Sequence, residues 1–215
     1  MDASTRKIPS HELTYATLRD MVLFGRLEPG QAVTIQGLCA DLGAGMTPVR
    51  EAIRRLTAEG ALMPQGNRRV AVPRLDAGHL DQLAFARLSI EPRLVELAAA
   101  KASPGLVLRL EGLDLAVDAA ITGGRVSDYL ESNHAFHFAL YEASEAHVLV
   151  DRARSLWLRF GPSLRVVCAR YGASALPDRH KEALVAMRRG DVAGLVAAMR
   201  ADIADGIAGV RGTLS

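Results

Sequence analysis

Residues 34–60 read TIQGLCADLGAGMTPVREAIRRLTAEG, and this stretch predicts two short helices joined by a tight turn. Thr34 is a suitable N-cap for the first helix, and Gly43 is placed to end it in the left-handed conformation. Thr47 is expected to cap the second helix, with Pro48 as its first residue, where proline costs no helical hydrogen bond. Two short helices separated by a four-residue turn form the helix-turn-helix pattern.

The flanking segments extend this pattern on both sides. Residues 13–24 carry apolar residues at helical spacing and end at Gly25, which predicts a helix ahead of the pair. Residues 61–63 and 70–72 read as two short strands around the turn-forming tip Gln65-Gly66-Asn67-Arg68. These elements together predict a winged helix-turn-helix with a small two-stranded wing.

Basic residues gather in this part of the chain. Residues 1–74 hold ten Lys and Arg against seven Asp and Glu, whereas the remainder holds sixteen against seventeen. Arg50 and Arg54 lie four residues apart, on the helix face opposite the apolar stripe, where they could contact guanine edges or phosphates. An ordinary solvated basic face is the competing interpretation for an isolated helix. The preceding helix and the arginine-bearing wing favour DNA binding.

The rest of the chain predicts helices only. Five or six helices are expected beyond Leu80, with breaks at residues 103–105, 122–124, 161–162, 171–177 and 190–191. Short loops place consecutive helices side by side, so an antiparallel all-α bundle is expected and the fold class is mostly α. The polar stretch from Pro73 to Gly78 is the expected linker between a domain of residues 1–74 and one of residues 75–215.

Composition excludes several classes of protein. No run reaches the roughly 18 apolar residues that a membrane helix needs, and the first ten residues lack the apolar core of a signal peptide. A cytoplasmic protein without a membrane partner is therefore expected. Cys39 and Cys168 lie far apart in apolar surroundings, which favours two small core residues over a disulfide or a cysteine-based zinc site.

The sequence resembles the GntR family of transcriptional regulators. Residues 25–72, with LEPG at 27–30 and TPVREA at 47–52, are similar to the DNA-binding domain of that family. The pattern Asn133-x-x-Phe136-His137, followed by His180 and a terminal helix reaching Asp202, resembles the ligand-binding domain of its FadR-like (FCD) branch. The resemblance implies a homodimer that binds double-stranded, imperfectly palindromic operator DNA.

The same resemblance implies which residues contact the operator. Thr47 and Arg50 would contact DNA at the start of the recognition helix, and Gly66, Asn67 and Arg68 would do so at the wing tip. Gln36 and Met46 depart from the family pattern, because relatives often carry arginine at these positions. An unusual half-site is expected, since one good bidentate arginine contact supplies about 1–3 kcal/mol of base discrimination.

Residue spacing predicts a second site in the helical domain. Asn133 and His137 are four residues apart and share one helix face. His180 and Asp202 lie eleven residues before and after Asp191, so an antiparallel hairpin turning there sets them level. An amide, two imidazoles and a carboxylate suit a divalent zinc, nickel or manganese ion. The alternative is that both histidines are hydrogen-bonded core residues.

The neighbouring His134 is expected at the surface or behind the ligands. The string HAFH at residues 134–137 lacks the glutamate of the His-Glu-x-x-His protease motif.

The FCD resemblance also implies an effector. Many FCD domains bind metal through an acidic or amide residue and three histidines, and Asp202 stands where the third histidine is usual. Small carboxylates commonly bind the metal and an arginine together, and Arg87 occupies a position where relatives often carry one. A helix salt bridge from Arg87 to Glu91 is the competing interpretation. Trp157, Arg159 and Arg165 are further candidates for the pocket lining.

These observations predict a repressor whose operator affinity is controlled by a small organic acid in a metal-containing pocket. A metal sensor, in which the divalent ion itself is the signal, is the first alternative. A metal-dependent enzyme is disfavoured, because no general base or nucleophile stands near the ligands in the sequence. A bundle that serves only for dimerisation is the third alternative.

Overall fold

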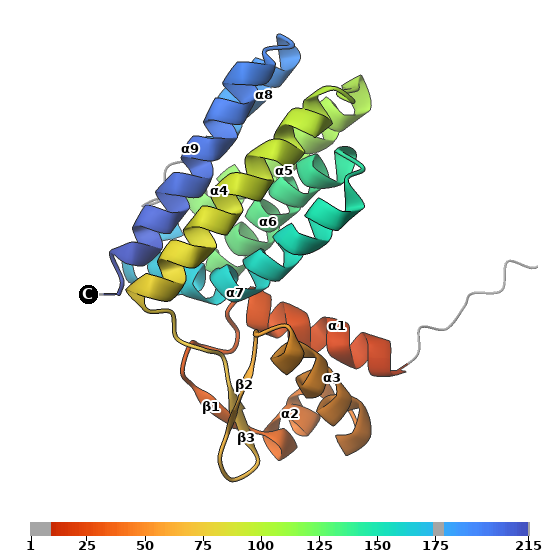
Figure 1. Ribbon diagram of the computed structural model, residues 1–215, viewed down its shortest axis with the longest axis vertical. Helices are drawn as coiled ribbons and strands as arrows, with labels where there is room; N and C mark the ends of the chain where they lie inside the picture. The colour runs from red at the N-terminus through yellow and green to blue at the C-terminus, as the bar shows by residue number, and fades with distance from the viewer. Residues whose placement is uncertain (1–9, 174–178, 215) are drawn as a thin grey trace, which may run out of the picture. The chain divides into compact units, whose positions relative to one another are not determined.

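The structure is a computed structural model that describes residues 10–173 and 179–214. The chain divides into two compact units, Met1–Arg74 and Leu75–Ser215, and each is described by itself. Figure 1 shows a small helical unit with a β-sheet and a bundle of longer helices.

The described part of the N-terminal unit, residues 10–74, contains three helices and three strands. In chain order these are α1 (Ser10–Leu23), β1 (Ala32–Thr34), α2 (Ile35–Leu42), α3 (Met46–Ala58), β2 (Met63–Gln65) and β3 (Arg69–Ala71). The Thr34 hydroxyl caps α2 by accepting from Gly37 N at 3.0 Å, and Gly43 ends the helix with φ 57°. Apolar side chains from all three helices are fully buried in its core: Leu18, Val22, Leu38, Val49 and Leu56.

Helix α3 begins earlier than the sequence predicted. Its N-cap is Gly45 rather than Thr47, and no side chain caps it. Pro48 therefore lies within the first turn, where backbone N–H groups have no helical acceptor and proline is still tolerated. Thr47 is left exposed on the first turn instead of being committed to a cap.

The predicted two-stranded wing is part of a three-stranded antiparallel sheet, so that prediction was incomplete. Its strand order is β1-β3-β2, and Val70 of β3 pairs with Val33 on one side and Pro64 on the other. Strand β1 is only three residues long, too short for an alternating pattern to be recognised. The wing tip turns through Asn67 and Arg68, at φ 62° and 56°.

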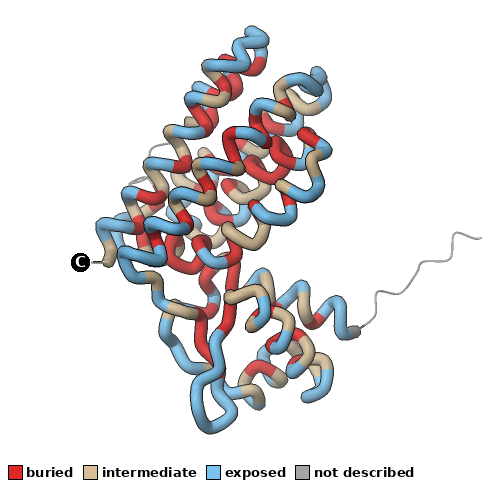
Figure 2. Tube along the Cα trace, viewed as in Figure 1, coloured by how far each residue is buried: buried red, intermediate tan, exposed pale blue. Residues whose placement is uncertain are grey.

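The C-terminal unit is an antiparallel bundle of six helices among the described residues. They are α4 (Ala77–Ala99), α5 (Pro104–Thr122), α6 (Val126–Ala143), α7 (His147–Tyr171), α8 (His180–Arg188) and α9 (Val192–Arg211). Asp76, Ser103 and Asp191 cap α4, α5 and α9 through their side chains. Buried residues line the helix faces that meet inside the bundle (Figure 2).

One predicted break was wrong. Gly161 and Pro162 lie inside the continuous helix α7, and both are buried. A proline inside a helix costs about 3 kcal/mol, but packing around this buried segment keeps the helix unbroken. The break between α6 and α7 was not predicted; it falls at Ser144 and Glu145, where Glu145 has φ 55°.

The predicted break at residues 171–177 lies partly outside the described residues. Among the described helices, none is long and apolar enough to cross a membrane.

Candidate DNA-binding face and ligand pocket

Helix α3 presents a polar face to solvent. Its apolar side chains Val49, Ala52, Ile53 and Leu56 are buried against the rest of the unit. The opposite face exposes Met46, Thr47, Arg50 and Arg54, and α2 exposes Gln36 near its start. The residues predicted to contact DNA on these helices are therefore all available to a ligand.

The arginines of α3 differ in what they already bind. Arg54 forms a bidentate pair with Glu51, with Nη2–Oε1 at 2.6 Å and Nε–Oε2 at 3.0 Å. Arg55 donates to Glu12 at 3.1 Å and lies over the Tyr15 ring. Within the described residues Arg50 forms no ion pair of this kind, so its guanidinium needs no displacement before it contacts a base.

The wing tip is exposed and fixed to the helices. Gly66, Asn67 and Arg68 are all exposed. The Arg68 carbonyl accepts a hydrogen bond from Ile35 N at 3.2 Å, which joins the tip to the start of α2. Both non-glycine residues have positive φ, a conformation that asparagine tolerates well and arginine less so.

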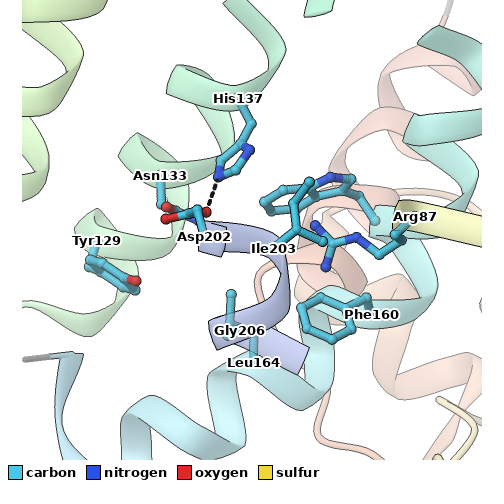
Figure 3. A pocket seen from close by; sticks show the side chains of 10 residues that line it. Arg87, Tyr129, Asn133, His137, Phe160, Leu164, Asp202, Ile203 and Gly206 are labelled. Carbon is cyan, nitrogen blue, oxygen red and sulfur yellow. Dashed lines mark ion pairs between the residues drawn. The ribbon is translucent and has the colours of Figure 1, made fainter. Parts of the chain in front are cut away.

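The bundle encloses a small cavity lined by most of the predicted ligand residues. Asn133 and His137 project into it from α6 and Asp202 from α9, and Arg87 approaches from α4 (Figure 3). The other lining residues are Tyr129, Trp157, Phe160, Leu164, Ile203 and Gly206. The cavity volume is about 30 Å³, enough for an ion with one or two waters, because one water occupies roughly 10–15 Å³ on this measure.

Three predicted ligands converge closely. One ligand atom each from His137, His180 and Asp202 lies within 4.8 Å of the other two. His137 Nε2 and Asp202 Oδ2 are 3.0 Å apart. His180 and Asp202 lie opposite each other on the two helices of the α8–α9 hairpin. The chain turns between these helices at Gly190, which has φ 67°, and the Asp191 carboxylate caps α9.

This donor set fits a divalent first-row ion. Imidazole nitrogen and carboxylate oxygen bind zinc-like ions at about 2.0–2.2 Å, so ligand atoms within 4.8 Å of one another can share one ion after small side-chain rotations. Asn133 lines the same cavity and adds an amide oxygen. His137 and His180 are each 1% exposed, so a bound ion would be shielded from bulk water.

The ionisation of the cluster favours cation binding. Burial lowers the pKa of His137, and the nearby Asp202 only partly opposes this effect. Burial alone would raise the pKa of Asp202, but contact with His137 and the proximity of His180 hold it below its usual value. Burial thus disfavours a charged His137, and the neutral imidazole is the form that a metal ligand requires.

Arg87 lines the cavity and is also paired. Its Nε and Nη2 donate to Glu91 Oε1 and Oε2 at 2.5 and 3.1 Å, the salt bridge that the sequence offered as the competing interpretation. Its guanidinium lies 4.6 Å from the Trp157 ring centroid and 4.3 Å from that of Phe160. Burial opposes its charge, but Glu91 raises the pKa of Arg87 above its usual value.

Several other expectations can be compared with the structure. Arg159 is exposed, while Arg165 donates to Ser127 Oγ at 2.8 Å. His134 is half-buried and stacks on Phe138 with ring centroids 4.3 Å apart. Cys168 is buried as expected, but Cys39 is only half-buried.

Two residues near the ligands were missed by the sequence analysis. Tyr141 follows His137 by one helical turn, and its hydroxyl lies 2.9 Å from His137 Nδ1; the four-residue spacing could have indicated it. Asp114 on α5 lies 3.7 Å from His180 Nδ1 through Oδ1, and it is buried. No local pattern marks Asp114, because its partner lies on a helix far away in the sequence.

Comparisons with known proteins extend over both units. Residues 11–72 match the bacterial regulatory proteins of the gntR family, and residues 82–205 match the FCD domain. The HTH-type transcriptional regulator McbR of Escherichia coli K12 is 30% identical over 147 residues, covering 68% of this chain and 66%, just under two thirds, of that protein. The Nta operon transcriptional regulator of Aminobacter aminovorans is 30% identical over 63% of this chain and 64% of its own length.

Solved structures show the same fold. The structure of Escherichia coli McbR/YncC superposes with a TM-score of 0.91 at 24% identity, covering 97% of this chain and all of that one. A putative GntR regulator from Rhodococcus sp. RHA1 gives 0.76 at 21% identity, covering 94% of this chain and 97% of that one. The relatives are transcriptional regulators, so the prediction that this protein is not an enzyme is confirmed. This chain belongs to the GntR family of bacterial transcriptional regulators and carries an FCD domain.

Proposed function

We propose that this chain is a cytoplasmic, homodimeric repressor whose affinity for operator DNA is controlled by a small organic acid bound beside a divalent cation in the bundle. Operator contacts are assigned to Gln36, Met46, Thr47, Arg50 and Arg54 on the helices and to Gly66, Asn67 and Arg68 on the wing. The cation ligands are Asn133, His137, His180 and Asp202, and Arg87 binds the acid.

The availability of Arg50 supports the DNA-binding assignment most directly. It lies one turn into the exposed face of α3 and holds no described carboxylate, whereas Arg54 and Arg55 each do. Exposed pairs such as Arg54–Glu51 contribute little to stability, so Arg54 can exchange its carboxylate for a phosphate at small cost. The face thus combines one side chain for base contact with others for the DNA backbone.

Convergence of three ligand atoms within 4.8 Å, from two buried histidines and the half-buried Asp202, is the observation that carries the pocket assignment. The charges in the pocket explain why its effector would be an acid. Arg87 and Glu91 cancel each other, Lys181 lies 3.8 Å from Asp114 and offsets its charge, ligating imidazoles are neutral, and Asp202 contributes one negative charge. A divalent cation would leave the pocket with a net positive charge, which attracts a carboxylate.

The small cavity implies that the acid acts by changing the bundle. A volume of about 30 Å³ accommodates an ion and one or two waters but not an organic acid. The acid must therefore bind a more open arrangement of the helices that surround the cavity. A ligand that binds one of two arrangements more tightly shifts their populations, which is how it could alter the DNA-binding form.

Elemental analysis tests the cation part of the proposal. Untagged protein expressed without added metal is compared with His137→Ala and His180→Ala, and Arg159→Ala serves as a control on an exposed bundle residue. About one ion per chain in wild type and control, lost from both histidine variants, supports the site. Full occupancy in either histidine variant would remove that residue from the ligand set.

Calorimetry tests the acid. Acetate, succinate and citrate are titrated into protein loaded with Ni²⁺ and into the same protein after treatment with EDTA. Binding of any of them only to the loaded form supports a carboxylate that ligates the cation. Equal binding to both forms would remove the cation from the effector site.

A metal sensor is the second candidate, because the cavity has room for an ion without an organic ligand. Operator fragments selected from random double-stranded DNA separate the two functions by fluorescence anisotropy. A metal sensor changes its operator affinity on addition of Ni²⁺ alone, whereas the proposed regulator changes it only when an acid is added as well.

A further inference from the structure

Glu91 lies at the end of a chain of buried hydrogen bonds that reaches the ligand cluster. Its side chain is fully buried on α4 and accepts from Arg87 at both oxygens. Its Oε2 also accepts from Trp157 Nε1 at 3.1 Å and from the Tyr141 hydroxyl at 2.6 Å. Tyr141 oxygen in turn lies 2.9 Å from His137 Nδ1.

The direction of each hydrogen bond in this chain is fixed by chemistry. Arginine and indole N–H groups only donate, so Glu91 acts as an ionised acceptor towards them. A tyrosine hydroxyl has a single proton, which Tyr141 donates to Glu91. The Tyr141 oxygen must then accept from its other neighbour, so His137 Nδ1 carries a hydrogen.

This direction determines which His137 nitrogen is left for a cation. With Nδ1 protonated and occupied by Tyr141, Nε2 is the nitrogen that faces Asp202 Oδ2 at 3.0 Å. Asn133, one turn earlier on α6, lines the same cavity. A histidine with its Nε2 protonated would instead point an N–H at the ion position and could not ligate it.

We propose that Glu91 is a positioning residue that acts through Tyr141 to fix His137 in the Nδ1–H form, with the Nε2 lone pair directed at the cation position. The proposal rests on the cation-containing pocket proposed above. Glu91 also accepts hydrogen bonds from Arg87, the residue proposed to bind the acid. One buried carboxylate therefore connects Arg87 to the cation ligand His137. An acid that draws Arg87 away from Glu91 thereby acts on the cation site, and the two ligands are coupled reciprocally.

The tautomer can be measured without any metal. Protein labelled with ¹⁵N-histidine is treated with EDTA, and the ring nitrogens of His137 are assigned by comparison with His137→Gln in long-range ¹H–¹⁵N spectra. A protonated Nδ1 is expected, whether Nε2 is unprotonated or, without a cation, donates to Asp202. A protonated Nε2 with an unprotonated Nδ1, or a mixture of the two neutral forms, would overturn the proposal.

Glu91, Tyr141 and His137 form a hydrogen-bond relay, and two variants interrupt this relay at different points. Tyr141→Phe removes the acceptor of the Nδ1 hydrogen, and His137 is expected to lose its single tautomer. In Glu91→Gln an amide NH₂ can donate to Tyr141, which then donates to Nδ1 and shifts His137 towards the Nε2–H form. If Glu91→Gln does not fold, Tyr141→Phe carries the test. Retention of the wild-type tautomer in a folded Tyr141→Phe protein would contradict the relay.

The effect on the cation is measured with Ni²⁺ alone. Trp157 is the only tryptophan of the chain, and its ring centroid lies 4.8 Å from that of His137, so its fluorescence reports a nearby paramagnetic ion. Loss of a hydrogen bond behind a ligating histidine typically weakens metal binding by about 10- to 100-fold, and this loss is expected for Tyr141→Phe.

Tyr15→Phe is the matched control. It also deletes a hydroxyl that donates to a glutamate, Glu59 at 2.8 Å, but it lies in the N-terminal unit. Wild-type Ni²⁺ affinity in Tyr141→Phe, or an equal loss in Tyr15→Phe, would overturn the proposal. A wild-type protein that binds no Ni²⁺ would instead refute the cation part of the proposed function, while the tautomer still decides the relay.

Discussion

Arginine–glutamate pairs one helical turn apart occur in both units, but their surroundings are opposite. Arg54 and Glu51 on α3 have side chains 74% and 42% exposed, whereas Arg87 and Glu91 on α4 are 2% and 0% exposed. The exposed pair can be exchanged for contacts with an external partner at little cost. Opening the buried pair leaves an unpaired charge in the core, so a ligand that competes for Arg87 also affects Glu91 and the groups that Glu91 binds.

The largest expected difference between the pairs is in stability. Glu91→Gln leaves the buried Arg87 without a countercharge, and breaking one partner of a buried pair costs about 3–5 kcal/mol of unfolding free energy. Glu51→Gln removes an exposed partner and should leave the urea midpoint unchanged. Urea unfolding of the two full-length variants, followed by circular dichroism, measures both. Equal midpoints would show that burial does not distinguish the pairs.

Removal of the cation should affect the bundle alone. A ligand at one hundred times its Kd stabilises the folded form by about 2.7 kcal/mol, so EDTA should lower the thermal midpoint reported by Trp157 fluorescence. That residue belongs to the bundle, and the N-terminal unit has no tryptophan. His180→Ala serves as the control and should melt at one temperature with or without EDTA. A midpoint that EDTA lowers as much in His180→Ala as in wild type would contradict the site.

The local signals in the sequence predicted the helix-turn-helix well. Thr34 and Gly43 bound α2 because a side-chain cap and a positive φ act within a few residues. The start of α3 was misplaced because Thr47 and Gly45 are both acceptable caps, and the choice depends on the turn before them. Strand β1 exists only through pairing with β3, thirty-seven residues further on, so no local pattern reveals it.

The ligand cluster was predictable only where spacing along one hairpin or one helix indicates proximity. Asn133 and His137 share a helix face, and His180 and Asp202 flank the turn at Asp191. The contact of Glu91 with Tyr141 joins residues fifty positions apart on different helices. Contacts of this kind follow from helix packing, so the relay could not be derived from the sequence.

Replacement of Arg50 tests the exposed side of the comparison. Arg50→Ala should weaken binding to a selected operator fragment by about 10- to 100-fold, since a bidentate base contact is worth about 1–3 kcal/mol. Arg54→Ala should cause a smaller loss that is similar for specific and random DNA, because phosphate contacts carry no sequence information. Fluorescence anisotropy at fixed salt measures both, and circular dichroism confirms folding. Unchanged specificity in Arg50→Ala would remove it from the base-reading face.

The smallest expected effect concerns the two cysteines, one in each unit. Cys39 is half-buried on α2, whereas Cys168 is buried on α7, where burial raises the pKa of its thiol from 9.0 to about 11. A thiol whose pKa is raised on folding favours the folded state below about pH 9, and this contribution is lost as pH rises through about 11.

Thiolate is the reactive form, so a disulfide reagent such as DTNB at pH 8 should label Cys39 first and Cys168 only slowly. Mass spectrometry after timed labelling assigns each site, and Cys39→Ser isolates the reaction of Cys168. In urea both thiols should react at similar rates, because the protection of Cys168 comes from the bundle core. Fast labelling of Cys168 in the folded protein would mean that this part of the bundle opens readily, and the contrast between an accessible DNA-binding unit and a closed ligand unit would fail there.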